Sequence, residues 1–217
     1  MTNKEIIEIA IEEIAIKSWG VTEQFLEIHD VERIDGVPQL DRIDRDKPGG
    51  VAIAYFPVKD EKFYFAVYIQ SSPTPEIVGI RTEHCNDISF QASSEILDFD
   101  ELAALTNLKP TGGWRKGALK KSGKTTYKYA LVKFSPNPEA DEFEDKLKKL
   151  LDFLEQDPIG IKKLVDLAEG YIQAAIIFHN GNTTLGGPHI DKESIQRMAA
   201  LNLKIDFDLY AEGKFFK

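Results

Sequence analysis

The stretch that decides the fold reads Phe63-Tyr64-Phe65-Ala66-Val67-Tyr68-Ile69-Gln70. Its strongly apolar residues fall on odd positions and alternate with Tyr64, Ala66 and Tyr68, which is the two-residue period of a strand with one buried face. A second apolar run at 51–56 precedes it, so the two runs predict an antiparallel hairpin. Residues 71–75 are rich in Ser and Pro and predict a turn, and residues 77–81 predict a further strand.

A helix is expected before this sheet. Thr2 and Glu5 have the spacing of a capping box, in which each residue satisfies a backbone N–H at the start of a helix. Apolar residues follow at helical spacing, at Ile6, Ile7, Ala10, Ile11 and Ile14. A short strand is expected at 25–31 and a loop at 35–50. Residues 1–82 are therefore predicted to form a helix plus antiparallel sheet unit.

The rest of the chain, residues 83–217, predicts a second unit with the order β-α-β-α-α-β-α-β. Its strands are expected at 88–92, 127–134, 171–178 and 205–209. Its helices are expected at 98–108, at 143–154, from Pro158 to Ala168 with Gly170 just beyond, and after Asp191. No long linker separates the two units. The predicted fold class is α+β, with the N-terminal helix and antiparallel sheet packed against the C-terminal unit.

Several motifs of the second unit resemble the bacterial domain-of-unknown-function family 4279. They are Leu108-Lys109-Pro110, Trp114-Arg115-Lys116-Gly117 and the closing stretch 198–210, and the resemblance covers residues 83–212. The chain departs from the family pattern in two places. Tyr127 and Tyr129 stand where the family often has Trp, and His189-Ile190-Asp191 stands where it usually has Leu-Ser. The resemblance implies no activity, because none is established for the family.

The charge balance limits the choice of partners. The 217 residues carry a formal net charge of -9, and residues 1–79 hold 15 acidic and 8 basic residues. Such a field repels a phosphate backbone, which argues against nucleic-acid binding over the whole surface. It is compatible with a cationic protein partner, but ordinary acidic solubility is the interpretation that we favour. The candidate partner-binding residues are Glu5, Glu8, Glu12, Glu13, Asp41, Asp44 and Asp46.

The location is expected to be cytoplasmic. The first residues lack the layout of a signal peptide, and no apolar run approaches the roughly 18 residues that a membrane span needs. The single cysteine, Cys85, cannot form an internal disulfide. It lies beside His84 in a polar stretch, and adjacent side chains on a strand point apart, so a catalytic role is not expected.

The most unusual segment runs from Lys109 to Lys133, with eight basic residues and no acidic one. Within it, a Gly-rich turn with Arg and Lys could bind an anion or a phosphate group. The candidate residues are Gly112, Gly113, Trp114, Arg115 and Lys116. The other interpretation, which we favour, is a solvated loop with Trp114 packed on the core. No Gly-Lys-Ser/Thr closes the turn, so it does not match a P-loop.

The remaining polar pairs point to no reaction. Asp206 and Asp208 share the water-facing side of a terminal strand. His179, His189 and Asp191 form no compact ligand motif, so no metal and no cofactor are expected. No Gly-x-Ser-x-Gly elbow is present. We therefore expect a non-catalytic protein-binding protein of the immunity or antitoxin type. The alternative is an anion- or phosphate-binding protein or enzyme that uses the basic loop.

Overall fold

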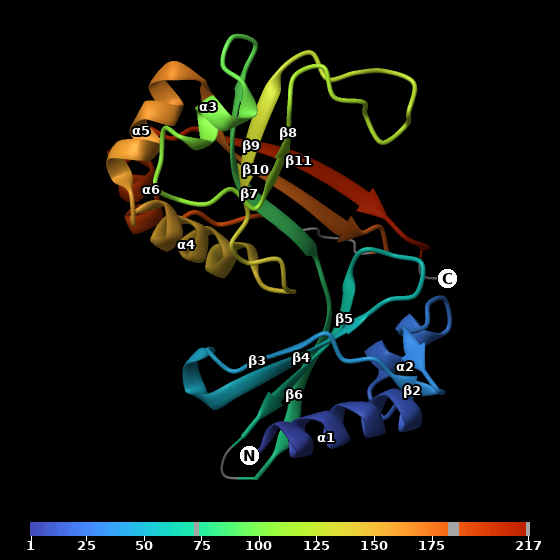
Figure 1. Cartoon of the computed structure of the whole chain (residues 1–217). Coiled ribbons are helices and arrows are strands. Elements are labelled where there is room, and N and C mark those ends of the chain that lie inside the picture. The colour runs from blue at the N-terminus through green and yellow to red at the C-terminus, as the bar shows by residue number, and fades with distance from the viewer. Residues whose placement is uncertain (72–73, 182–186, 216–217) are drawn as a thin grey trace.

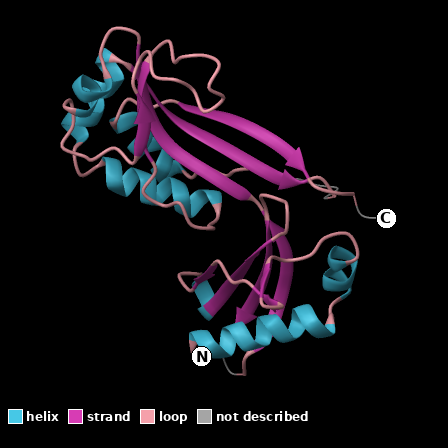
Figure 2. Ribbon diagram, turned by 45° about the vertical axis from the view of Figure 1, so that its right-hand side comes forward, coloured by secondary structure: helices cyan, strands magenta, loops and turns pink. Residues whose placement is uncertain are grey.

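The chain folds into two packed α+β units (Figure 1), as the sequence predicts. The computed structural model describes residues 1–71, 74–181 and 187–215. Each unit consists of one main sheet with helices on one face, and the two sheets meet near His84 (Figure 2). The proposed division at residue 82 therefore lies close to the point where the chain passes from one sheet to the other.

The first unit begins with helix α1 (Asn3–Ile16), whose N-terminus has the predicted capping box between Thr2 and Glu5. Its sheet has the order β3-β4-β5-β6 and is antiparallel throughout, which confirms the hairpin. The strands are β3 (Arg42–Asp44), β4 (Val51–Pro57), β5 (Tyr64–Gln70) and β6 (Glu76–Glu83). Phe65, Val67 and Ile69 face the same core as α1, whereas Tyr64, Ala66 and Tyr68 face the second unit.

Two sequence predictions for this unit are wrong. Residues 25–31 are not a strand: helix α2 (Gly20–Leu26) buries Phe25, and Val31 makes only an isolated bridge with Val58. Phe25 and Val31 both lie in the core, but they belong to different elements, so their apolar character does not mark one strand. The expected loop at 35–50 contains β3. It also holds part of a small hairpin of β1 (Arg33–Ile34) and β2 (Val37–Pro38) and a 3-10 turn, η1 (Pro48–Gly50).

The second unit has a five-stranded sheet with the order β11-β10-β7-β9-β8. Only the β10–β11 pair is parallel. The strands are β7 (Cys85–Ser94), β8 (Gly112–Trp114), β9 (Ala130–Phe134), β10 (Glu169–His179) and β11 (Ile205–Glu212). The helices are α3 (Phe99–Ala103), α4 (Phe143–Leu154), α5 (Pro158–Leu167) and α6 (Lys192–Ala200). The predicted element order holds, with β8 added.

The helices of this unit lie on one face of its sheet (Figures 1 and 2). The apolar stripe of α4, with Leu147, Leu151 and Leu154, packs with Phe90 and Ile172 in one continuous core. Fully burying a side chain of this size contributes roughly 1.5–3 kcal/mol, so this helix layer is a main source of stability. The opposite face of the sheet carries no helix among the described residues.

Some boundaries differ from the prediction. Helix α3 keeps its capping box at Asp98 and Glu101 but ends at Ala103 rather than near Leu108. Gly170 is not a helix cap, because it lies inside β10, where an added Cβ would meet Val165 at 2.9 Å. The expected loop at 179–189 falls partly on residues 182–186, which lie outside the described part.

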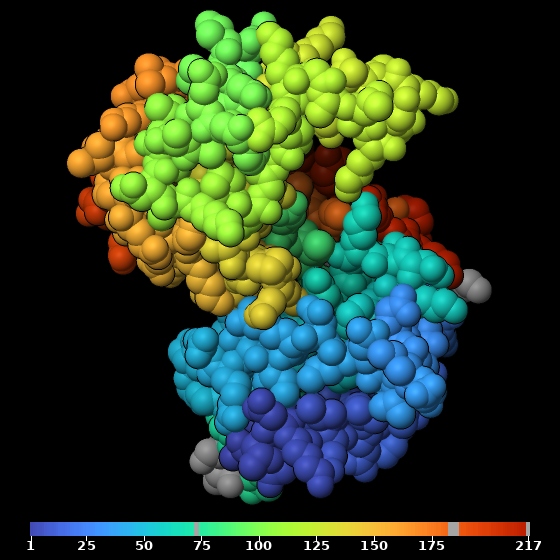
Figure 3. Space-filling model, in the orientation of Figure 1, coloured from blue at the N-terminus to red at the C-terminus, as the bar shows by residue number. Residues whose placement is uncertain are grey.

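The two units are joined by buried charged groups. Arg42 of β3 donates to the carbonyl oxygen of Ala140 at 2.7 Å and pairs with the carboxylate of Asp141 at 2.9 Å. Lys47 reaches Asp44 at 3.1 Å and Glu142 of the second unit at 2.6 Å. The pKa of Lys47 is raised above its ordinary value: its carboxylate partners outweigh the opposing effect of burial. Figure 3 shows the surfaces around residues 40–50 and 140 in contact.

A pair of histidines also connects the two units, away from the charged groups. The Nε2 atoms of His29, after α2, and His179, at the end of β10, lie 3.0 Å apart. Both side chains are buried, and the ring of Phe63 lies against each of them. The carbonyl oxygen of Lys214 also lies 3.0 Å from the Nε2 atom of His179. Because an oxygen of this kind only accepts, this geometry favours a proton on the Nε2 atom of His179.

Candidate functional site

The open face of the second sheet gathers polar and aromatic side chains from neighbouring strands. The strand register places Ser93 of β7 between Glu169 of β10 and Leu131 of β9, all on this face. Tyr171 follows Glu169 by two residues and therefore points to the same side. The sheet thus fixes these side chains on a rigid base, a suitable foundation for a binding site.

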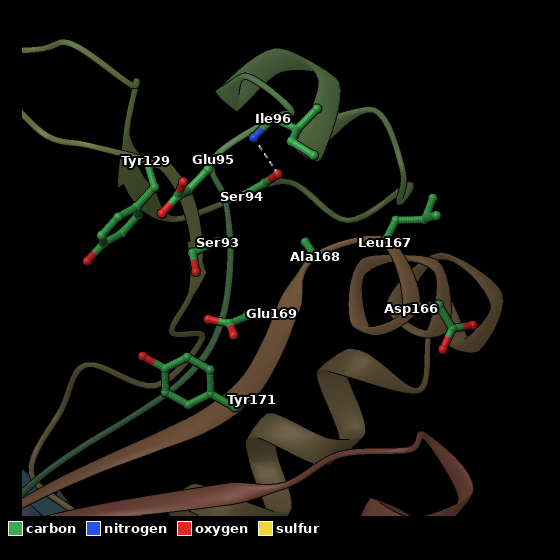
Figure 4. Close-up of a pocket in the computed structure, with 10 residues that line it drawn as sticks. All are labelled: Ser93, Ser94, Glu95, Ile96, Tyr129, Asp166, Leu167, Ala168, Glu169 and Tyr171. Carbon is green, nitrogen blue, oxygen red and sulfur yellow. Dashed lines mark hydrogen bonds between the residues drawn. The ribbon is translucent and has the colours of Figure 1, made fainter.

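One end of this face forms a pocket of about 710 Å³ (Figure 4). Its polar lining includes the hydroxyl groups of Ser93, Tyr129 and Tyr171 and the carboxylates of Glu95 and Glu169. The whole lining consists of Ser93, Ser94, Glu95, Ile96, Tyr129, Asp166, Leu167, Ala168, Glu169 and Tyr171. In the close-up, Ser93, Glu169 and the hydroxyl of Tyr171 lie along one side of the pocket. The Ser94 hydroxyl accepts hydrogen bonds from the backbone N–H groups of Ile96, at 3.1 Å, and Leu97, at 3.0 Å, and so orders the loop at the rim.

The electrostatic character of the pocket is acidic. Its described lining holds three carboxylates and no lysine, arginine or histidine. The pKa of Tyr171 is raised by burial first, then by the neighbouring Tyr129 and by the carboxylates of Asp206 and Asp208 on β11. Lys204 lies 5.6 Å from the ring centre of Tyr171, which shows that this ring already accepts a cation on one face.

This arrangement suits recognition of a cation. Carboxylates accept charge-assisted hydrogen bonds from ammonium or guanidinium groups, and tyrosine rings attract such cations through their faces. Ile96 and Leu167 are 92% and 60% exposed at the rim, where they can cover the apolar stem of a long basic side chain. The lining offers acceptors and flat surfaces rather than a nucleophile held against a base.

The basic segment has a different structure from the one the sequence suggested. Gly112 and Gly113 belong to strand β8 instead of a turn, and Trp114 stacks on Tyr127 with ring centres 4.4 Å apart. Arg115 gives two hydrogen bonds to Asp100, at 2.7 and 2.8 Å, and a third to Asp98 at 3.2 Å. Its guanidinium fork is therefore already occupied by carboxylates.

Lys116 is also engaged, since its ammonium group donates to the carbonyl oxygen of Glu95 at 2.6 Å. The anion site remains a prediction, but an anion would have to displace these contacts before it could use Arg115 or Lys116. The structure explains Gly113 by close packing: an added Cβ would lie 2.0 Å from the carbonyl oxygen of Leu131.

The predicted acidic contacts divide into exposed and internal groups. Glu5, Glu8 and Glu12 are exposed on α1, and Asp41 and Asp46 are exposed near β3. Glu13 is buried and accepts hydrogen bonds from the Ser18 hydroxyl and the backbone N–H of Trp19. Asp44 is buried against Lys47. These last two carboxylates hold the first unit together and are not available on its surface.

The other groups considered for chemistry have structural partners. Asp44, Asp141 and Asp145 place carboxylate oxygens within 4.8 Å of one another, but Arg42 and Lys47 pair with members of this group. We therefore assign it to the junction of the units. Asp191 caps α6. Burial raises the pKa of the Cys85 thiol, which makes it a poorer nucleophile.

Sequence reasoning missed the pocket residues Glu95, Tyr129, Glu169 and Tyr171. A signal was present in Tyr129 and Tyr171, which alternate with the buried residues Ala130 and Ile172 and so belong to the other face. The strand order was not visible, because β7 pairs with β10 across a separation of more than seventy residues.

Together, these features define a two-unit α+β chain whose second sheet carries an acidic pocket with two tyrosines at one end of its open face. The chain belongs to the family described as Domain of unknown function (DUF4279), whose model matches residues 83–212. This match confirms the resemblance inferred from the motifs. No curated protein and no solved structure matches the chain significantly. Among the helices of the described residues, none is long and apolar enough to cross a membrane.

Proposed function

We propose that this chain is a non-catalytic binding protein that captures a cationic protein partner through the pocket on its second sheet. The observation that carries the proposal is the pairing of the carboxylates of Glu95 and Glu169 with the rings of Tyr129 and Tyr171 in one pocket. A lysine or arginine side chain of the partner can place its charged group among the carboxylates and its stem against the rings.

The surrounding charge supports the same partner. Asp206 and Asp208 extend the acidic surface along β11, and the whole chain carries a net charge of -9. An acidic field of this kind accelerates the encounter with a basic protein and weakens as salt is added. We therefore expect association to slow markedly between low and physiological ionic strength.

The role we propose is that of an immunity- or antitoxin-type protein in the bacterial cytoplasm, which neutralises a basic toxin by binding it. Such a protein needs a rigid, charged surface and no catalytic group of its own. Gene neighbourhood tests this role separately from the binding site. A neighbouring gene for a secreted toxin supports it, whereas a conserved place in a metabolic operon contradicts it.

The binding site is tested with a probe peptide that alternates arginine and glycine, measured by isothermal titration calorimetry. The double variant Glu95→Gln plus Glu169→Gln removes two charges from the pocket while keeping the shape of both side chains. Exposed ion pairs contribute roughly 0.2–1 kcal/mol each, so we expect the double variant to bind several-fold to about tenfold more weakly.

A matched control is the double variant Glu8→Gln plus Glu12→Gln, which removes the same charge from the exposed face of α1. This control should bind the peptide within about twofold of wild type. Equal losses in the two double variants would show that only net charge matters. Absence of any binding by the wild-type chain would contradict the proposed function itself.

A further inference from the structure

Strand β11 leaves one long edge of the second sheet open. It is the terminal strand in the sheet order, and its outer side pairs with no other described strand (Figure 1). The other edge strand, β8, is only three residues long. In the first unit, the long edge strand β6 has a register irregularity in its pairing with β5, a feature that discourages further pairing.

The hydrogen-bond pattern shows which backbone groups face outward. The backbone N–H of Ile172 donates to the carbonyl oxygen of Lys204 at 2.8 Å, and that of Asn180 donates to the carbonyl oxygen of Glu212 at 2.7 Å. The even-numbered residues of β11 therefore direct their backbone N–H and C=O groups toward β10. Because backbone direction alternates along a strand, the odd-numbered residues direct their N–H and C=O groups to the open edge. These residues are Ile205, Phe207, Leu209 and Ala211.

The side chains of β11 differ in character on its two faces. Phe207 and Leu209 lie on the helix side and are 38% and 56% exposed. Asp206 and Asp208 lie on the open face, the same face as the pocket residue Tyr171. An exposed edge of this length with apolar residues is a template for another strand. Its carboxylates specify what kind of strand fits.

We propose that β11 binds an extended segment of a basic partner, which adds a further strand to the sheet. The segment would alternate basic side chains, facing Asp206 and Asp208, with apolar side chains facing Phe207 and Leu209. Neighbouring strands lie about 4.8 Å apart, so a basic side chain on the added strand can reach these carboxylates. A second copy of β11 fits less well, since it would bring further carboxylates to the same edge and no cation.

This inference deepens the proposed function, on which the basic character of the partner rests, by naming how the partner is held. The probe is a ten-residue peptide that alternates lysine and valine, measured by fluorescence anisotropy. The variant Leu209→Pro removes one outward N–H group without touching a bond to β10, and proline is tolerated on an edge strand. Leu209→Ala is the matched control, because it shortens the same side chain and keeps the N–H.

We expect Leu209→Pro to weaken peptide binding at least tenfold and Leu209→Ala to stay within about threefold. Two forms of the peptide, each methylated on the backbone nitrogens of one edge, test the wild-type chain without any risk to its folding. One form should bind and the other should not. Equal binding of the two methylated peptides, or equal effects of proline and alanine, would overturn the added strand.

The outcomes separate this inference from the proposed function. If the arginine–glycine peptide binds at the pocket but the lysine–valine peptide does not bind at β11, the added strand is wrong and the proposed pocket site is still supported. If neither peptide binds, both are wrong. A dimer in sedimentation that Leu209→Pro abolishes would assign the edge to a second copy and overturn the basic segment.

Discussion

Acid should weaken this fold through His29. The pKa of His29 is lowered from 6.5 to about 4, chiefly because burial disfavours the charged form, and the charges of His179 and Lys214 add to this. The unfolded chain therefore takes up the proton first as the pH falls. The stabilisation is complete above pH 6.5 and is lost progressively toward pH 4. A pKa shift of this size lowers the free energy of unfolding by about 2 kcal/mol at pH 5 and by about 3 kcal/mol below pH 4.

Urea unfolding between pH 8 and pH 5 measures this loss. His29→Phe removes the titrating group and keeps an aromatic ring against Phe63, so its stability should depend less on pH than that of wild type. Burial also lowers the pKa of His84, which leaves a residual dependence of the same sign. His189→Gln, at an exposed position of the second unit, is the control substitution. Equal losses of unfolding free energy in wild type and His29→Phe over this range would refute the role of His29.

Three further outcomes follow from particular contacts. Lys47→Met removes the cation that Asp44, Glu142 and Asp145 share and leaves buried Asp44 only its longer pair with Arg42 at 3.6 Å, so it should cost about 3 kcal/mol in urea unfolding; a loss below 1 kcal/mol would contradict the Asp44–Lys47 pair. Gly113→Ala places a Cβ 2.0 Å from a carbonyl oxygen and should lower the melting temperature by at least several degrees, whereas Gly112→Ala meets nothing within 4 Å and should cost under about 1 kcal/mol. In a thermal-shift screen with phosphates, nucleotides and dicarboxylates, wild type and the double variant Arg115→Ala plus Lys116→Ala should show the same shifts. The reason is that Asp98 and Asp100 already occupy the guanidinium group of Arg115. A ligand that stabilises wild type alone would support the anion site.

Local signals predicted the elements whose ends are set by nearby residues. The capping box of Thr2 and Glu5 fixes the start of α1, and Asp191 starts α6 by accepting the backbone N–H of Ser194 at 2.7 Å. The alternation at 63–70 likewise indicates one buried face, since the two-residue period holds whatever the neighbouring strand is. In each case, the interaction that decides the structure lies within a few residues in the sequence.

Features that depend on distant partners were not predictable in the same way. Gly112 and Gly113 have the composition of a turn, yet pairing with Lys133 and Val132 makes them a strand. The pocket has the same origin, because Glu95, Tyr129 and Glu169 meet only through the order of three strands. The water-facing position expected for Asp206 and Asp208 leaves Leu209 for the buried side of the strand, yet the helix layer leaves Leu209 56% exposed.

The most direct test of the proposed binding site is a titration of the isotope-labelled chain with the arginine–glycine peptide, followed by ¹H–¹⁵N chemical-shift mapping. The account predicts saturable shifts at the amides of Ser93, Glu95, Tyr129, Glu169 and Tyr171, on the open face of the second sheet. Shifts confined to Glu5, Glu8 and Glu12 on α1, with the pocket amides unmoved, would contradict it.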